Sequence, residues 1–401
     1  MVISRSTALR RCTCFLLTLL TAIAAPAQKK EISQARTILK SKRGVEQAER
    51  LMTNLLKDSA NRDNKRIYEL WYEAVLQQYE AVNEKLYTKQ RQDTAQFFDL
   101  TRRLFTVAEA LDSLDMRPDR KGRIAPEHRR QNAEQLNKFR PNLFNGCTYH
   151  VRKGDFQKAF EFSEAYMDCA RQPLFTGYHY DSLDTRMPEA AYWATYSAYR
   201  MNDPVKTLRH RKLALRDTTK AMFTLQYMAE ARRQLHDDSL YMETLRQGFS
   251  RYPTGSYFFP RLMDYYTARG DYGQALSTAD RALQVCDTCQ LYIYAKSTVL
   301  FSLERYDECI ALSDTLIAMN DSTPDPYYNA GTAWLNKALK LHPLREKKKL
   351  RSTYQQARHY MERYRQLAPD DKQKWGPALY RIYLNLNMGK QFDEIDRLLK
   401  K

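Results

Sequence analysis

Glycine and proline are scarce in this chain, with 12 and 14 copies in 401 residues. A large antiparallel sheet needs many tight turns, and glycine and proline are the residues that favour them. The composition therefore argues against a sheet. Alanine, leucine, arginine, lysine, glutamate and glutamine are frequent instead, and these residues have the highest helix propensities. The sequence predicts an all-α fold.

Motifs of enzymes are also lacking. The chain has no glycine-rich phosphate loop, no Gly-x-Ser-x-Gly segment and no His-Glu-x-x-His pair. Its seven histidines are far apart, and His359 with Glu362 has no further ligand nearby in the sequence, whereas a metal site needs three or four converging ligands. We therefore expect no catalytic site, no cofactor and no metal site.

Only one apolar run stands out, at residues 12–24, and it is shorter than the roughly 20 residues that span a bilayer. Arg5, Arg10 and Arg11 precede it, and Ala25-Pro26-Ala27 follows with the small residues that a signal peptidase requires. This arrangement predicts a signal peptide cleaved after Ala27. The mature chain is then exported and has no transmembrane segment.

Negative charge is in deficit. The formal charge of +18 falls to +15 without residues 1–27, which contain three arginines and no acidic residue. Such a charge favours acidic partners, among them nucleic acid, anionic polysaccharide, lipopolysaccharide and acidic proteins. Export makes nucleic acid the least plausible of these.

A short turn recurs along the chain. Gly154-Asp155-Phe156, Gly270-Asp271-Tyr272 and Glu304-Arg305-Tyr306 each place an aromatic residue after a polar turn. A small residue follows three positions after each aromatic, namely Ala159, Ala275 and Cys309. This pattern resembles the turn between helices A and B of the tetratricopeptide repeat, in which small residues let two antiparallel helices pack closely.

A spacing of 34 residues extends the resemblance, with repeat starts at 188, 222, 256, 290 and 324. The unit at Pro324 matches helix A of the family best, through Tyr327, Gly331 and Trp334. The resemblance implies a right-handed superhelix, or α-solenoid, of helix-turn-helix repeats. With its export signal, the chain also looks like exported repeat proteins of Bacteroides-type bacteria, located in the periplasm or at the outer membrane of a Gram-negative cell.

The last repeat is longer than the others. Gly331 and Ala357 lie 26 residues apart where the spacing requires 12, and the 14 extra residues amount to about four helical turns. We predict a lengthened helix pair, broken near His342-Pro343. A basic run lies in the extension: Arg345, Lys347, Lys348, Lys349 and Arg351.

The predicted organisation therefore has five parts. These are a signal peptide (1–27), an irregular helical region with one repeat-like pair (28–139), a repeat-like unit followed by a loop at 172–187 (140–187), the regular repeats (188–369) and capping helices (370–401).

The resemblance also implies a binding face, because helices A line the concave surface in this family. The residues at its groove positions include Tyr192, Tyr196, Tyr199, Arg200, Arg233, Tyr294 and Tyr328. The first three tyrosines follow i, i+4, i+7 spacing and share one stripe of a helix. Such a stripe either lines the groove or packs in the core, and a register shift of one or two residues exchanges the two readings.

Five cysteines follow residue 27, and Cys286 and Cys289 have Cys-x-x-Cys spacing. A zinc site requires a second pair, which is missing, and a redox centre requires a different local fold. In an oxidising compartment the pair closes into a disulfide, and the alternative is two unlinked thiols.

We therefore expect a non-catalytic scaffold of the cell envelope that binds a protein or peptide, with an acidic partner favoured by the charge. The alternative is a glycan-binding protein, because exposed tyrosine stacks on sugar rings.

Overall fold

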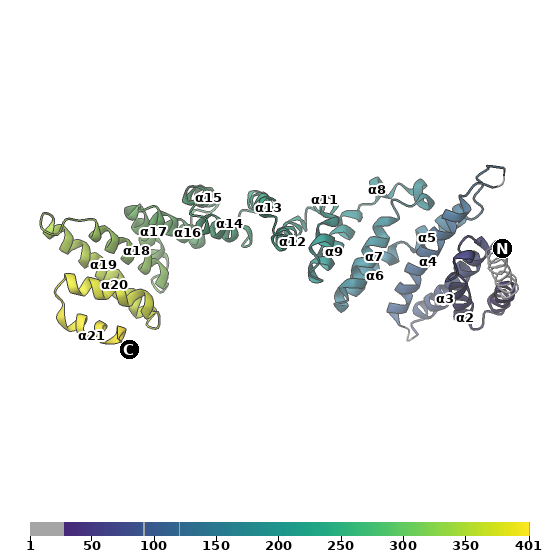
Figure 1. The fold of residues 1–401 in the computed structure, drawn as a ribbon, viewed down its shortest axis with the longest axis horizontal. Coiled ribbons are helices and arrows are strands. Elements are labelled where there is room, and N and C mark those ends of the chain that lie inside the picture. The colour runs from purple at the N-terminus through teal and green to yellow at the C-terminus, as the bar shows by residue number, and fades with distance from the viewer. Residues whose placement is uncertain (1–27, 91–92, 120, 401) are drawn as a thin grey trace, which may run out of the picture. The chain divides into compact units, whose positions relative to one another are not determined.

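The computed structural model describes residues 28–90, 93–119 and 121–400, which form helices and turns and contain no strand (Figure 1). The predicted all-α fold is confirmed. The predicted signal peptide lies outside the described residues. The described chain divides into two compact units, which we call unit 1 (up to Leu235) and unit 2 (from His236). The hand of the superhelix stays a prediction. None of the described helices is long and apolar enough to cross a membrane.

The first described helix of unit 1 covers residues 28–41. Two short 3₁₀ helices, η1 and η2, lie between the later α-helices. Its elements are α2 (Val45–Leu55), η1 (Ser59–Asn61), α3 (Lys65–Tyr87), α4 (Thr94–Asp115), α5 (Arg129–Phe139), α6 (Pro141–Lys153), α7 (Phe156–Asp168), η2 (Pro173–Tyr178), α8 (Tyr180–Leu183), α9 (Met187–Arg200), α10 (Pro204–Arg209), α11 (Arg211–Ala214) and α12 (Ala221–Gln234).

Unit 2 is more regular, because each helix packs against the next one in the chain. Its helices are α13 (Asp238–Arg251), α14 (Phe258–Ala268), α15 (Tyr272–Val285), α16 (Gln290–Ser302), α17 (Tyr306–Met319), α18 (Pro324–Leu339), α19 (Lys347–Leu367), α20 (Lys372–Asn385) and α21 (Gly389–Leu399). The helices that occupy position A of the repeats, α9, α12, α14, α16 and α18, begin within two residues of the starts given by the 34-residue spacing. The boundary between the units falls in the chain between α12 and α13.

The recurring turn has one local construction in both units. An aspartate accepts a hydrogen bond from the backbone N–H three residues ahead and so caps the next helix. The residue before each aspartate has a positive φ, which lets the chain reverse sharply. The pairs are Gly154-Asp155, Asn202-Asp203, His236-Asp237 and Gly270-Asp271. Asparagine or histidine in place of glycine hides two of these turns from a search for Gly-Asp.

Small residues lie where paired helices are closest. Ala159, Ala275, Cys309 and Ala357 are completely buried. A Cβ atom added to Gly331 would lie 3.0 Å from Cε and 3.3 Å from the backbone nitrogen of Met361 on α19. A larger residue at Gly331 would therefore require Met361 to shift.

The lengthened helix pair has the expected break. Helix α18 ends at Leu339, α19 begins at Lys347, and a short turn joins them. The basic run of the sequence thus occupies the end of this turn and the first turns of α19.

The predicted loop at residues 172–187 has short helices and buried side chains of its own. It contains η2 and α8, and Phe175 and Tyr180 are buried in the core of unit 1. The Arg140 guanidinium lies 3.8 Å from the centres of both the Tyr166 and Tyr180 rings and pairs with Asp184 at 2.6 Å. The segment is therefore fastened to the core by a buried cation, which makes it a poor candidate for a freely exposed contact loop.

Candidate functional site

Four tyrosines from two neighbouring A helices of unit 1 form one aromatic cluster, which we call the tyrosine surface: Tyr192, Tyr196 and Tyr199 on α9 and Tyr227 on α12. The Tyr199 and Tyr227 rings stack with their centres 4.6 Å apart. Tyr196 lies 5.8 Å from Tyr227 and is stacked on Tyr192 at 6.4 Å. The sequence placed the first three residues on one stripe. It missed Tyr227, which is adjacent to the predicted groove position Gln226.

The four rings are not equally accessible. Tyr192 is 7% exposed and belongs to the hydrophobic core, whereas Tyr196, Tyr199 and Tyr227 are half-buried. The stripe therefore combines the two predicted alternatives: Tyr192 packs in the core, and Tyr196 and Tyr199 are partly exposed. Burial raises the pKa of Tyr227, and a hydrogen bond with Tyr192 raises it further. The surface available to a ligand consists of three partly exposed rings on a core-anchored base.

Positive charge borders these rings. Arg200 is exposed, its guanidinium lies 4.4 Å from the centre of the Phe156 ring, and its Nη1 donates to the Tyr196 hydroxyl at 2.6 Å. Lys220 Nζ lies 5.6 Å from the centre of the Tyr192 ring and pairs with Glu189 and Asp217. Arg233, also predicted as a groove residue, is exposed and pairs with Glu230 at 2.9 Å. Arg200 is thus the cation most directly joined to the tyrosine surface.

Two predicted groove residues lie in unit 2. Tyr294 is half-buried and borders a hollow of about 200 Å³ together with Leu291, Leu316 and Asp325. Burial raises the pKa of Tyr294, and the charge of Asp325 adds to this effect. The Tyr328 ring lies 5.1 Å from that of Tyr364. Five of the seven predicted residues therefore lie in unit 1 and two in unit 2.

The Cys-x-x-Cys pair lies in the turn between α15 and α16. Cys286 and Cys289 are half-buried, and both are free thiols in this structure. Their oxidation to a disulfide stays a prediction.

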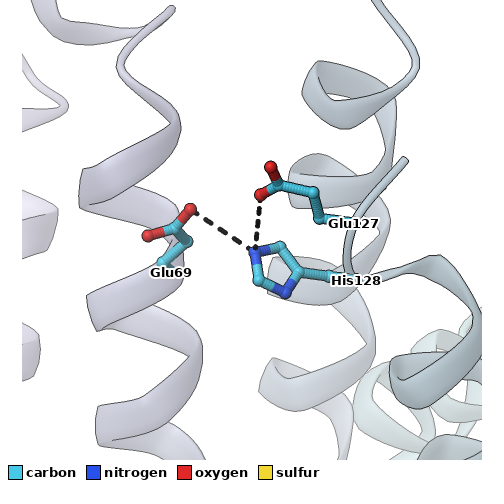
Figure 2. A group of neighbouring side chains, drawn as sticks. All are labelled: Glu69, Glu127 and His128. Atoms are coloured by element: carbon cyan, nitrogen blue, oxygen red, sulfur yellow. Dashed lines mark ion pairs between the residues drawn. The ribbon is translucent and has the colours of Figure 1, made fainter. Parts of the chain in front are cut away.

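A further polar group lies between α3 and the start of α5, where Glu69, Glu127 and His128 converge (Figure 2). His128 Nε2 is 3.4 Å from an oxygen of Glu69 and 3.9 Å from one of Glu127. One imidazole and two carboxylates are ligand types that a divalent metal accepts. This group was not predicted from the sequence, because Glu69 lies 58 residues before Glu127 and the three residues follow no ligand motif.

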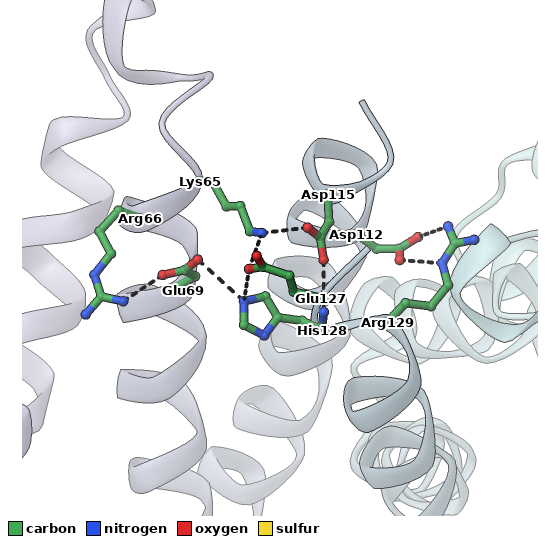
Figure 3. A network of polar contacts seen from close by, with 8 residues as sticks. All are labelled: Lys65, Arg66, Glu69, Asp112, Asp115, Glu127, His128 and Arg129. Atoms are coloured by element: carbon green, nitrogen blue, oxygen red, sulfur yellow. Dashed lines mark hydrogen bonds and ion pairs between the residues drawn. The ribbon is translucent and has the colours of Figure 1, made fainter. Parts of the chain in front are cut away.

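The neighbouring cations favour a different role for this group (Figure 3). Lys65 Nζ is 2.9 Å from the Glu127 carboxylate and 2.6 Å from that of Asp115, and Arg66 pairs with Glu69 at 2.7 Å. Burial alone would raise the pKa of Asp115, but its hydrogen bonds to Lys65 and to the His128 backbone lower it below its usual value. Since each carboxylate already has a cation, we interpret the group as an ion-pair network that fastens the segment before α5 to α3 and α4.

Comparisons with known proteins give structural likenesses only. No family model and no curated protein matches the chain. Among solved structures, it is similar to the C-terminal part of a TPR repeat-containing protein from Cytophaga hutchinsonii, with 12% identity over 63% of this chain and 92% of that one, at a TM-score of 0.44. It is similar to yeast Tom70, with 12% identity over 90% and 89% of the two chains and a TM-score of 0.35. The TPR2AB domain of yeast Sti1, in its complex with pHSP90, shows 14% identity over 77% and 97%, with a TM-score of 0.26.

Likenesses at these scores carry no argument about function. The class of the protein follows from its own helices: an all-α repeat protein of tetratricopeptide-type helix pairs, with capped turns and small residues at the pair contacts.

Proposed function

We propose that the protein is a non-catalytic scaffold of the cell envelope that binds a peptide or partner protein on the tyrosine surface. The observation that carries this proposal is the row of partly exposed rings on α9 and α12 that pack against one another, with Arg200 at its edge. Tyrosine and arginine are the residues that most often anchor protein interfaces, because they combine a large apolar area with directional hydrogen bonding.

The surface is suited to a partner with both apolar and acidic groups. Tyr196 and Tyr227 pack against the buried Tyr192, and Tyr199 stacks on Tyr227. Because the rings are already ordered, little side-chain entropy is lost when a ligand covers them. Arg200 donates one hydrogen bond to Tyr196 and has further N–H groups that suit a carboxylate.

Location in the cell envelope is part of the same proposal, and residues 1–27 support it by their charge and apolar pattern. We expect the mature protein to begin at Gln28 and to be found outside the cytoplasm. Amino-terminal sequencing of the protein from fractionated cells tests this, and a chain that retains Met1 in the cytosol would contradict it.

Site-specific photocrosslinking tests the binding surface. A benzophenone amino acid replaces Tyr196 in one variant and Tyr87, an 88% exposed tyrosine on α3, in the control. We expect one envelope protein to be captured through position 196 and not through position 87. Adding Tyr199→Ser and Arg200→Ala to the position 196 variant should abolish this capture.

A glycan array, probed with the same purified protein, tests the alternative ligand class. If the parent binds a glycan and the variant with Tyr196→Ser and Tyr199→Ser does not, the protein is a glycan-binding protein and the scaffold proposal is wrong. If neither assay depends on these residues while the variants stay folded, the tyrosine surface is not the binding site.

A further inference from the structure

The turn between α18 and α19 carries a concentration of positive charge in unit 2. Residues 340–351 include six lysines and arginines and one acidic residue, Glu346. Lys340 pairs with Glu304 at 2.6 Å, and Lys349 approaches Glu346 only to 3.9 Å. The remaining four cations are exposed and form no ion pair with any residue in the described ranges: Arg345, Lys347, Lys348 and Arg351.

These cations occupy an electrostatically unfavourable place. Lys347, Lys348, Lys349 and Arg351 lie in the first two turns of α19, and its first turn has no acidic residue. The N-terminal end of a helix carries a partial positive charge, so cations there destabilise the helix and repel one another. Three other helices of unit 2, α13, α17 and α18, have an acidic residue in the first turn. Because this cluster of cations does not stabilise the helix that carries it, the cluster points to a role outside folding.

An apolar side chain protrudes beside the charges. Leu344 is 85% exposed and Leu339 is 50% exposed. The turn is nevertheless ordered by its own hydrogen bonds. The backbone N–H of His342 donates to Glu346 Oε2 at 2.9 Å, and those of Leu344 and Arg345 donate to His342 Nδ1 at 3.3 and 3.2 Å. The exposure of Leu344 is therefore a property of a defined turn.

We propose that this basic tip, formed by Leu339, Leu344, Arg345, Lys347, Lys348, Lys349 and Arg351, docks on the surface of an anionic lipid bilayer. Anionic headgroups attract clustered lysines and arginines, and the boundary between headgroups and acyl chains accepts an apolar side chain. A leucine that protrudes among cations fits this boundary better than a protein interface, where leucine is seldom a main anchor. The inference is independent of the tyrosine surface, which belongs to unit 1.

Vesicle co-sedimentation tests the proposal with the full chain as purified from its source cells, after amino-terminal sequencing. The vesicles consist of phosphatidylcholine alone, or of phosphatidylcholine with an equal amount of phosphatidylglycerol. Binding to the neutral vesicles measures any contribution from a retained apolar N-terminus. We expect additional binding to the anionic vesicles, and this binding should fall as salt screens the charges.

Charge reversal at the tip should remove this additional binding. Lys347→Glu, Lys348→Glu and Lys349→Glu together should weaken it at least about tenfold, because each cation near an anionic surface contributes appreciably. The matched control reverses Arg36, Lys40 and Arg43, which are equally exposed in unit 1 and change the net charge by the same amount. This control should alter binding by less than about twofold, because its charges are not part of the tip.

The role of Leu344 is tested by a variant and a matched control. Leu344→Ser should weaken binding roughly fivefold or more, and this loss should persist in high salt because it removes apolar burial. Leu384→Ser, at a 54% exposed position on α20, should have no effect.

Three results would overturn the proposal: no preference of the parent for anionic vesicles, equal losses in the tip and control reversals, or binding of the tip to acidic protein or nucleic acid without binding to vesicles. Circular dichroism of every variant distinguishes lost binding from lost folding. A chain with Tyr196→Ser and Tyr199→Ser should bind vesicles like the parent, which keeps this test separate from that of the proposed function.

Discussion

Unit 2 repeats one kind of helix pair, whereas unit 1 is less regular and has buried charged side chains between its helices. In unit 2 the pair contacts are made by glycine and alanine, as at Gly331 and Ala275, and the ion pairs are largely exposed. In unit 1, Arg140 is 5% exposed between two tyrosine rings, and Asp112 and Asp115 are buried beside Arg129 and Lys65. The comparison indicates that unit 2 is stabilised mainly by close helix packing, and that unit 1 depends in addition on a few buried charges.

The largest expected effect comes from removing the buried cation of unit 1. Arg140→Ala leaves Asp184 without its cation and a gap between Tyr166 and Tyr180. Breaking a buried pair in this way typically costs about 3–5 kcal/mol. Urea unfolding followed by circular dichroism measures it. As the control in unit 2, Arg305→Ala removes an exposed bidentate pair with Glu308 and should leave the unfolding midpoint unchanged. Equal effects in both units would contradict the comparison.

Close packing in unit 2 is tested by adding volume. Gly331→Leu and Ala275→Leu should each destabilise the protein by about 1–3 kcal/mol or more, because Gly331 is in close contact with Met361 and Ala275 is completely buried. Gly273→Leu, on the exposed side of α15, is the control, since nothing nearer than 3.8 Å would meet its Cβ. If all three variants unfold at the same urea concentration as the parent, the assignment of the pair contacts is wrong.

A smaller, pH-dependent effect should be confined to unit 1. Burial of Glu109 on α4 raises its pKa to about 8, and the charge of Asp168 contributes. Between pH 4.5, the pKa of this group in the unfolded chain, and pH 8, Glu109 is ionised in the unfolded chain but still protonated in the folded one. The contribution of Glu109 is thus fully present below pH 4.5 and is lost as the pH rises towards 8, by at most about 1.4 kcal/mol per pH unit. Unfolding at several pH values should give a shallower decline for Glu109→Gln than for the parent, and parallel curves would contradict this.

The difference between the units also determines what could be predicted from the sequence. Helix starts such as Pro324, and the turns at Gly154 and Gly270, depend on residues that are close together in the chain, so periodicity reveals them. Arg140 has partners 26 and 40 residues away in Tyr166 and Tyr180, and no local pattern encodes their meeting.

The candidate site shows the same limit at the scale of one helix. The spacing of Tyr192, Tyr196 and Tyr199 established that they share a stripe. The degree of burial of each ring depends on how α9 is rotated against α12, and a rotation of one residue changes it. The sequence consequently could not separate the buried Tyr192 from the accessible Tyr196 and Tyr199, and it missed Tyr227 on the neighbouring helix.

The most direct test of the central claim compares matched tyrosine changes in the two units. The dissociation constant of the partner captured through position 196 is measured for three folded proteins: the parent, Tyr196→Ser with Tyr199→Ser, and Tyr294→Ser with Tyr328→Ser. Two interface tyrosines typically contribute enough binding energy that the unit 1 change should weaken binding at least about tenfold. The unit 2 change should leave the dissociation constant unchanged. Equal affinity of all three proteins, or a loss seen only with the unit 2 change, would contradict the assignment of the tyrosine surface as the binding site.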